Sequence, residues 1–161
     1  MGLGPSAWAL RHILDANLKF TKAGLKTFLR VENANDDDKE YPKFGFQRNV
    51  DPATTSSGFT DVEITPWPAV EAMSLHNIGL NAGKLDFGSH SFLISHTFVL
   101  KRMKQLGITE PQEVFVGPSV IGLFYNGRLY SIVSYVPETA GGGIVSWTVL
   151  GNAMEVAAPT T

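Results

Sequence analysis

The stretch Gly122–Val136, GLFYNGRLYSIVSYV, carries the clearest structural signal in the chain. Asn126-Gly127 lies between two apolar runs, and this dipeptide favours a two-residue type I′ turn with positive φ at both central positions. The stretch therefore predicts a β-hairpin.

A two-residue turn also fixes which side chains of the hairpin share a face. On one face the opposed pairs are Tyr125 with Arg128, Leu123 with Tyr130 and Ile121 with Ile132. On the other face they are Phe124 with Leu129, Gly122 with Ser131 and Val120 with Val133. Neither face has the polar character of a solvent-facing surface, so we expect both to be covered.

Composition favours one folded domain. The chain has 161 residues, 43% of them hydrophobic and 17% charged, which is enough for one core and too little for two ordinary domains.

The net charge of −2 gives no electrostatic footprint for nucleic acid or membrane. Cysteine is absent, which excludes disulfides, thiol catalysis and cysteine-based metal sites. Without a membrane span or signal peptide, we expect a soluble chain of intracellular origin.

The N-terminal region, residues 1–32, is predicted to be a helical arm. Ser6 is a plausible N-cap, and the apolar residues that follow at helical spacing are Trp8, Leu10, Ile13, Leu14 and Leu18. After Gly24, the segment LKTFLRV continues as a further helical turn or as a short strand. Residues 33–58, rich in Asn, Asp, Pro, Ser and Gly, are predicted to be a loop or linker.

Residues 59–152 are predicted to be a β-rich core domain, and residues 153–161 a C-terminal tail. FTDVEITPW alternates as a half-buried strand, and IVSWTVL forms the last strand. Between them, Ser95 is expected to cap a short helix that ends at Gly107. We therefore predict an α+β fold, with a small antiparallel β-barrel or sandwich, one short inserted helix and the helical arm.

A search for catalytic or ligand-binding chemistry finds one histidine cluster and little else. His90 and His96 would share a face in a continuous strand, and His76 could add a ligand, so a metal-dependent enzyme is one hypothesis. The change to a helix near Ser95 breaks that face. The chain has no G-x-S-x-G elbow and no complete phosphate loop. We expect no enzyme activity, no cofactor and no bound metal.

The two-sided hairpin instead suggests assembly. A sheet that is apolar on both faces is often covered on one of them by a neighbouring subunit. We therefore predict that Tyr125, Arg128 and Tyr130 form a subunit-interface face. Trp8 and Leu14, together with Leu18, are predicted to make the contacts of the arm with an adjacent chain.

In its organisation, the region Phe59–Asn152 resembles the small β-barrel neck proteins of tailed bacteriophages, the stopper or head-completion family. The features that match are an N-terminal strand, a glycine-punctuated excursion with a short helix, and terminal strands of the type VIGLFYNGRLYSIVSYVPETAGGGIVSWTV. The resemblance implies a structural virion protein, made in the bacterial cytoplasm, that forms a hexameric or dodecameric ring between the portal or adaptor and the tail. DNA would pass through the ring without sequence recognition, and no membrane would be involved.

The resemblance further implies that the excursion from about His76 to Ser89 is a gating or ring-contact loop, with Leu80, Lys84, Leu85 and Phe87 as its contact residues. The N-terminal arm departs from the usually shorter family members, which leaves a tail terminator or another tail-ring protein as alternatives. Two alternatives of other classes remain: the metal-dependent enzyme that uses His76, His90 and His96, and a β-barrel that binds a small ligand or peptide.

Overall fold

The computed structural model describes residues 4–21, 26–32, 58–73 and 89–154. Along the chain the elements are helix α1 (Ala7–Thr21), strands β1 (Thr27–Glu32), β2 (Phe59–Glu63), β3 (Ala69–Ala72) and β4 (His90–Ser95), helices α3 (His96–Leu106) and α4 (Glu113–Val116), and strands β5 (Val120–Tyr125), β6 (Arg128–Ala140) and β7 (Gly143–Ala153). The expected α+β class is confirmed. Within these ranges, no helix has the length and apolar character needed to cross a bilayer.

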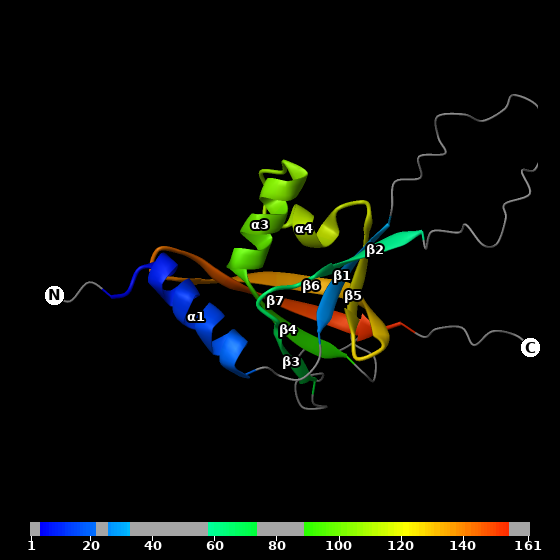
Figure 1. Cartoon of the computed structure of the whole chain (residues 1–161), viewed down its shortest axis with the longest axis horizontal. Helices are drawn as coiled ribbons and strands as arrows, with labels where there is room; N and C mark the ends of the chain where they lie inside the picture. The colour runs from blue at the N-terminus through cyan, green and yellow to red at the C-terminus, as the bar shows by residue number, and fades with distance from the viewer. Residues whose placement is uncertain (1–3, 22–25, 33–57, 74–88, 155–161) are drawn as a thin grey trace, which may run out of the picture.

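The strands form one antiparallel sheet of seven strands in the order β2-β1-β5-β6-β7-β4-β3. The sheet curls into a half-barrel, and α3 and α4 lie together on one side of it (Figure 1). The described edge strands β2 and β3 do not pair with each other, so the sheet does not close into a barrel by strand pairing. Residues 64–68 connect these two edges along the chain, and Ile64, Pro66 and Pro68 are buried.

The segment after Gly24 corrects the prediction of a helical arm over residues 1–32. The helical character is confirmed for Ala7–Thr21, but Thr27–Glu32 forms β1, which pairs with β2 on one side and β5 on the other. Thr27 and Leu29 are almost completely buried on the inner face, and Val31 packs against the core beside them. Alternating burial of this kind suits a strand and not a helix.

The predicted hairpin is confirmed at its turn. Asn126 has φ 49° and Gly127 has φ 73°, and the β5–β6 ladder pairs Tyr125 with Arg128, Phe124 with Leu129, and Leu123 with Tyr130. The ladder ends there, so the expected pairs of Ile121, Gly122 and Val120 with β6 do not form. At Gly122 the two strands approach so closely that a Cβ atom would lie 2.3 Å from the carbonyl oxygen of Tyr130.

The core lies between the concave face of the sheet and the helices α3 and α4. Both predicted ends of α3 are confirmed: Ser95 accepts a hydrogen bond from the backbone N–H of Thr97, and Gly107 adopts the left-handed conformation with φ 67°. The short helix α4 is an addition to the single inserted helix that the sequence predicts. The buried hydrophobic residues with no exposed surface at all are Ile64, Phe92, Ile94, Val99, Leu123 and Val149.

Candidate assembly surface

The buried carboxylate of Asp15 joins helix α1 to the sheet through hydrogen bonds. Asp15 is 8% exposed and accepts hydrogen bonds from the hydroxyl of Ser95 and, at 2.6 Å, from the hydroxyl of Thr97. Ser95 is also the N-cap of α3, so one hydroxyl donates to α1 and accepts from the first turn of α3. Asp15 therefore links α1 to the junction between β4 and α3.

Further contacts at the beginning and near the end of α1 attach the helix to the remainder of the domain. The N–H of Ala7 donates to the carbonyl of Gly141 at 3.0 Å, and the hydroxyl of Ser6 accepts from Ala9 as predicted for an N-cap. Gly141 has φ 59°, and a Cβ there would lie 2.5 Å from the nitrogen of Ala7. Near the other end, Leu18 is 5% exposed. Figure 1 shows α1 beside the sheet, away from α4, and its sheet contacts are with β7, β4 and β6.

The side of α1 that faces away from Asp15 and Leu18 carries apolar side chains exposed to solvent. Ile13, Ala16 and Phe20 follow the spacing i, i+3, i+7, which places them on one face of a helix, and all three are exposed. Ile13 is 56% and Phe20 86% exposed. We call these three residues the outer stripe of α1. A rigidly held helix thus presents an apolar stripe on the surface of the described chain.

The residues predicted as arm contacts fall on different sides of α1. Trp8 is 64% exposed and packs edge-on against His12. Leu14 is half-buried and Leu18 is buried within its own chain, so Leu18 is not available to a neighbouring subunit. Sequence reasoning missed Ile13 and Phe20 as outward residues. Their helical positions, about half a turn away from Leu18, were the signal that could have found them.

The hairpin face predicted as a subunit interface faces the inside of the half-barrel. Tyr130 is 3% exposed, and its ring centre lies 5.5 Å from that of Phe92 and 4.9 Å from that of His90. Burial raises the pKa of the Tyr130 hydroxyl. Tyr125 is half-buried in the same aromatic group, and Arg128 is exposed beside the turn. The chain's own residues therefore cover Tyr130, which corrects the expectation for this side chain.

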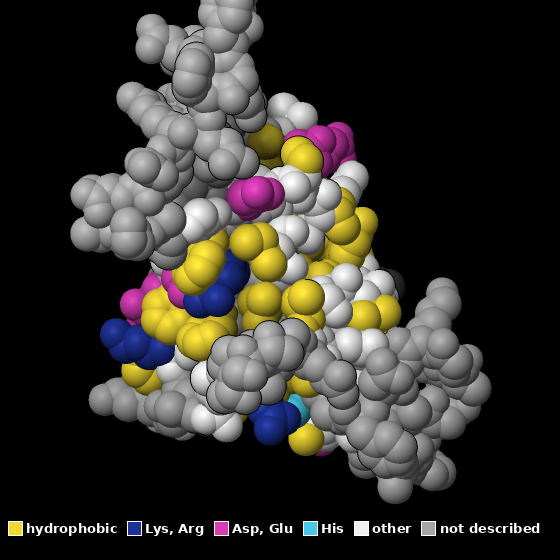
Figure 2. Space-filling model, turned by 90° about the vertical axis from the view of Figure 1, so that its right-hand side faces the viewer, with side chains coloured by type: hydrophobic (Ala, Val, Ile, Leu, Met, Phe, Trp, Pro, Cys, Tyr) yellow, Lys and Arg dark blue, Asp and Glu magenta, His cyan; other side chains and the backbone are white. Residues whose placement is uncertain are grey.

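On the other face of the hairpin, the side chain of Arg30 from β1 lies over Phe124, while Val133 of β6 is 38% exposed. The guanidinium carbon of Arg30 lies 3.8 Å from the ring centre of Phe59 and 4.5 Å from that of Phe124. Its Nε and Nη2 donate to the two carboxylate oxygens of Asp61, each at 2.7 Å. The hydrogen bond to Asp61 raises the pKa of Arg30. Figure 2 shows hydrophobic side chains gathered around basic ones on this side of the molecule.

The histidines considered as metal ligands lie in different environments. His90 belongs to the aromatic group around Tyr130. His96 is buried at the start of α3, where its Nδ1 accepts a hydrogen bond from Trp147 at 3.0 Å. His76 lies outside the described residues. In the part of the chain that the structure describes, no three histidine or acidic side chains form a group that could hold a metal ion.

The predicted loop contacts Leu80, Lys84, Leu85 and Phe87 also lie outside the described residues.

No protein-family model, no curated protein and no solved structure matches the chain.

Proposed function

We propose that the chain is a structural subunit of a ring at the head–tail junction of a tailed bacteriophage. In this role it joins the portal or adaptor to the tail and helps to retain the packaged genome. The organisation of the β-rich region supports the proposal, as does the surface chemistry of α1.

The observation that carries the proposal is the outer stripe of α1. Burying an exposed aliphatic or aromatic side chain of this size stabilises a complex by about 1.5–3 kcal/mol. Ile13 and Phe20 are largely exposed, while Asp15 and Leu18 fix the helix that bears them. Because the helix is already held in place, a neighbouring subunit could bury the stripe without the entropic cost of ordering an arm.

The half-barrel offers a second means of contact between subunits. Among the described strands, β3 lies at one edge, and the edge of a sheet can extend its hydrogen bonding into another chain. A ring needs two different surfaces on each subunit, because head-to-tail contacts close into a ring when the rotation between subunits permits it. The stripe and a sheet edge are two such surfaces.

Immunogold electron microscopy of particles from the source organism tests the proposed location. An antibody against the full chain should place gold at head–tail junctions. Gold at the far end of tails, as for another tail protein, or antigen found only in the soluble fraction would overturn the proposal.

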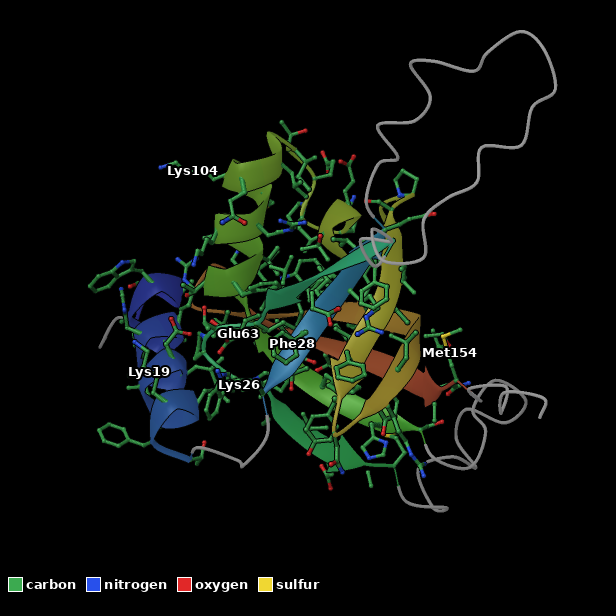
Figure 3. The ribbon with its side chains drawn as sticks, turned by 45° about the vertical axis from the view of Figure 1, so that its right-hand side comes forward. Lys19, Lys26, Phe28, Glu63, Lys104 and Met154 are labelled. Atoms are coloured by element: carbon green, nitrogen blue, oxygen red, sulfur yellow. The ribbon has the colours of Figure 1, made fainter. Side chains whose placement is uncertain are left out.

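A variant pair tests the assembly surface. Ile13→Glu with Phe20→Glu should prevent incorporation into particles while leaving the folded chain intact by circular dichroism, because both residues lie in solvent. Lys104→Glu is the matched control, since Lys104 projects from α3 away from α4 (Figure 3). Normal incorporation of the double variant would remove the stripe from the interface.

A further inference from the structure

A groove lies between the inner face of β1 and β5 and the helices α3 and α4. Its volume is about 510 Å³. Most of its wall is apolar and is made by Leu29, Val31, Leu106, Val114, Val116 and Val120. Grooves of this size and character are typical of small-molecule sites, in which a few polar groups fix the orientation of the ligand.

The cationic group in this wall is Arg102 of α3. Its Nε atom is buried and has no hydrogen-bond partner among the described residues. The guanidinium contacts Gln105 only through Nη1, at a long 3.5 Å. A buried N–H donor without an acceptor is rare in folded proteins, because burial removes the water that would otherwise pair with it. Arg102 also has no ion-pair partner among the described residues, so its guanidinium is an unneutralised cation in a mostly apolar wall.

We propose that this groove binds a small amphipathic monocarboxylate, with its carboxylate on Arg102 and its aliphatic chain along the valine and leucine wall. A carboxylate matches the planar fork of the guanidinium and accepts from it in a charge-assisted hydrogen bond. Glu113 also lines the groove, so the local charge favours a single negative charge over a phosphate. The site is independent of the outer stripe of α1 and goes beyond the proposed ring function.

Calorimetric titration of the full chain tests the proposal with octanoate and with octanol, which has the same length but no charge. Octanoate should bind with one site per chain, and octanol should bind about tenfold more weakly or less, as expected for the loss of one charge-assisted hydrogen bond. Equal binding of the two compounds, or no saturable binding of octanoate, would overturn the proposal.

Three variants locate the binding site. Arg102→Met removes the guanidinium but keeps much of the side-chain length, and it should weaken octanoate binding about tenfold without changing octanol binding. Lys104→Met removes a positive charge from the exposed side of the same helix and should bind octanoate as the unchanged chain does. Val116→Glu places a carboxylate at an exposed position of the groove wall and should also weaken octanoate binding. Undiminished binding by Arg102→Met and Val116→Glu would place octanoate elsewhere and refute the assignment.

Discussion

Trp147 donates its indole N–H to Nδ1 of His96 across 3.0 Å, joining β7 to the first residue of α3 inside the core. Since Nδ1 accepts this hydrogen bond, it carries no proton, and the imidazole is the neutral tautomer protonated at Nε2. Burial and then the nearby charge of Arg11 lower the pKa of His96 below its usual value. The bond therefore belongs to the neutral form of the histidine.

This bond predicts a loss of stability in mild acid. Because the folded state has the lower pKa, the unfolded chain takes up the proton first as the pH falls below about 6.5, and unfolding becomes easier. The His96→Asn variant keeps an acceptor near Nδ1 but does not titrate. Urea unfolding at several pH values should show the unchanged chain losing stability relative to this variant between about pH 7 and pH 5. Parallel pH profiles would contradict the assignment.

Removal of the Asp15 carboxylate should weaken the attachment of α1. The Asp15→Ala variant leaves the hydroxyls of Ser95 and Thr97 without their acceptor, and this should cost about 1–3 kcal/mol of unfolding free energy. Asn17 is exposed on the same helix, so Asn17→Ala should change stability by no more than about 0.5 kcal/mol. Denaturant titration of both variants measures the difference, and equal stabilities would argue against the link.

Arg30 should not tolerate replacement by lysine. Lysine keeps the charge but loses the two-point contact with Asp61 and the flat stacking between Phe59 and Phe124, so Arg30→Lys should destabilise the fold by about 1–2 kcal/mol. Arg128→Lys, at an exposed position beside the hairpin turn, serves as the control. A stability for Arg30→Lys within error of the control would show that charge alone matters there.

Gly122 should resist even the smallest side chain. A Cβ there would meet a backbone oxygen at 2.3 Å, and backbone cannot move aside as a flexible side chain can. Gly122→Ala should therefore lower the unfolding free energy by about 1–3 kcal/mol or more. Gly58→Ala, where a Cβ would have no neighbour within 4 Å, should be nearly neutral in the same thermal or urea unfolding experiment. A neutral Gly122→Ala would mean that the two strands can separate at little cost.

The features that sequence predicted correctly are local ones. The Asn126-Gly127 turn, the Ser95 cap and the Gly107 end of α3 each depend on the backbone preferences of one or two residues. These preferences act whatever the rest of the chain does. The same holds for the three hairpin pairs nearest the turn, whose register the turn dictates.

The features that sequence left open depend on distant partners. The segment at Thr27–Glu32 reads equally as a helical turn or a strand until β2 and β5 supply its hydrogen bonds. The curl of the sheet decides that Tyr130 faces the core, and no local pattern reveals it. The link from Asp15 to Ser95 joins segments far apart along the chain, so a carboxylate on the apolar side of a helix was the only available signal.

The position of β1 in the sheet has a consequence for how the protein is made. β1 leaves the ribosome before its inner neighbour β5, which follows only after β2, β3, β4, α3 and α4 have been synthesised. A two-stranded ribbon is marginally stable in water, so Leu29 has no completed core to enter until the C-terminal strands emerge. Until β5 is synthesised, the apolar strand β1 has no inner neighbour to cover it. Native contacts between segments so far apart in the sequence also slow folding. During synthesis, an uncovered strand of this kind is a segment that a chaperone would protect from aggregation.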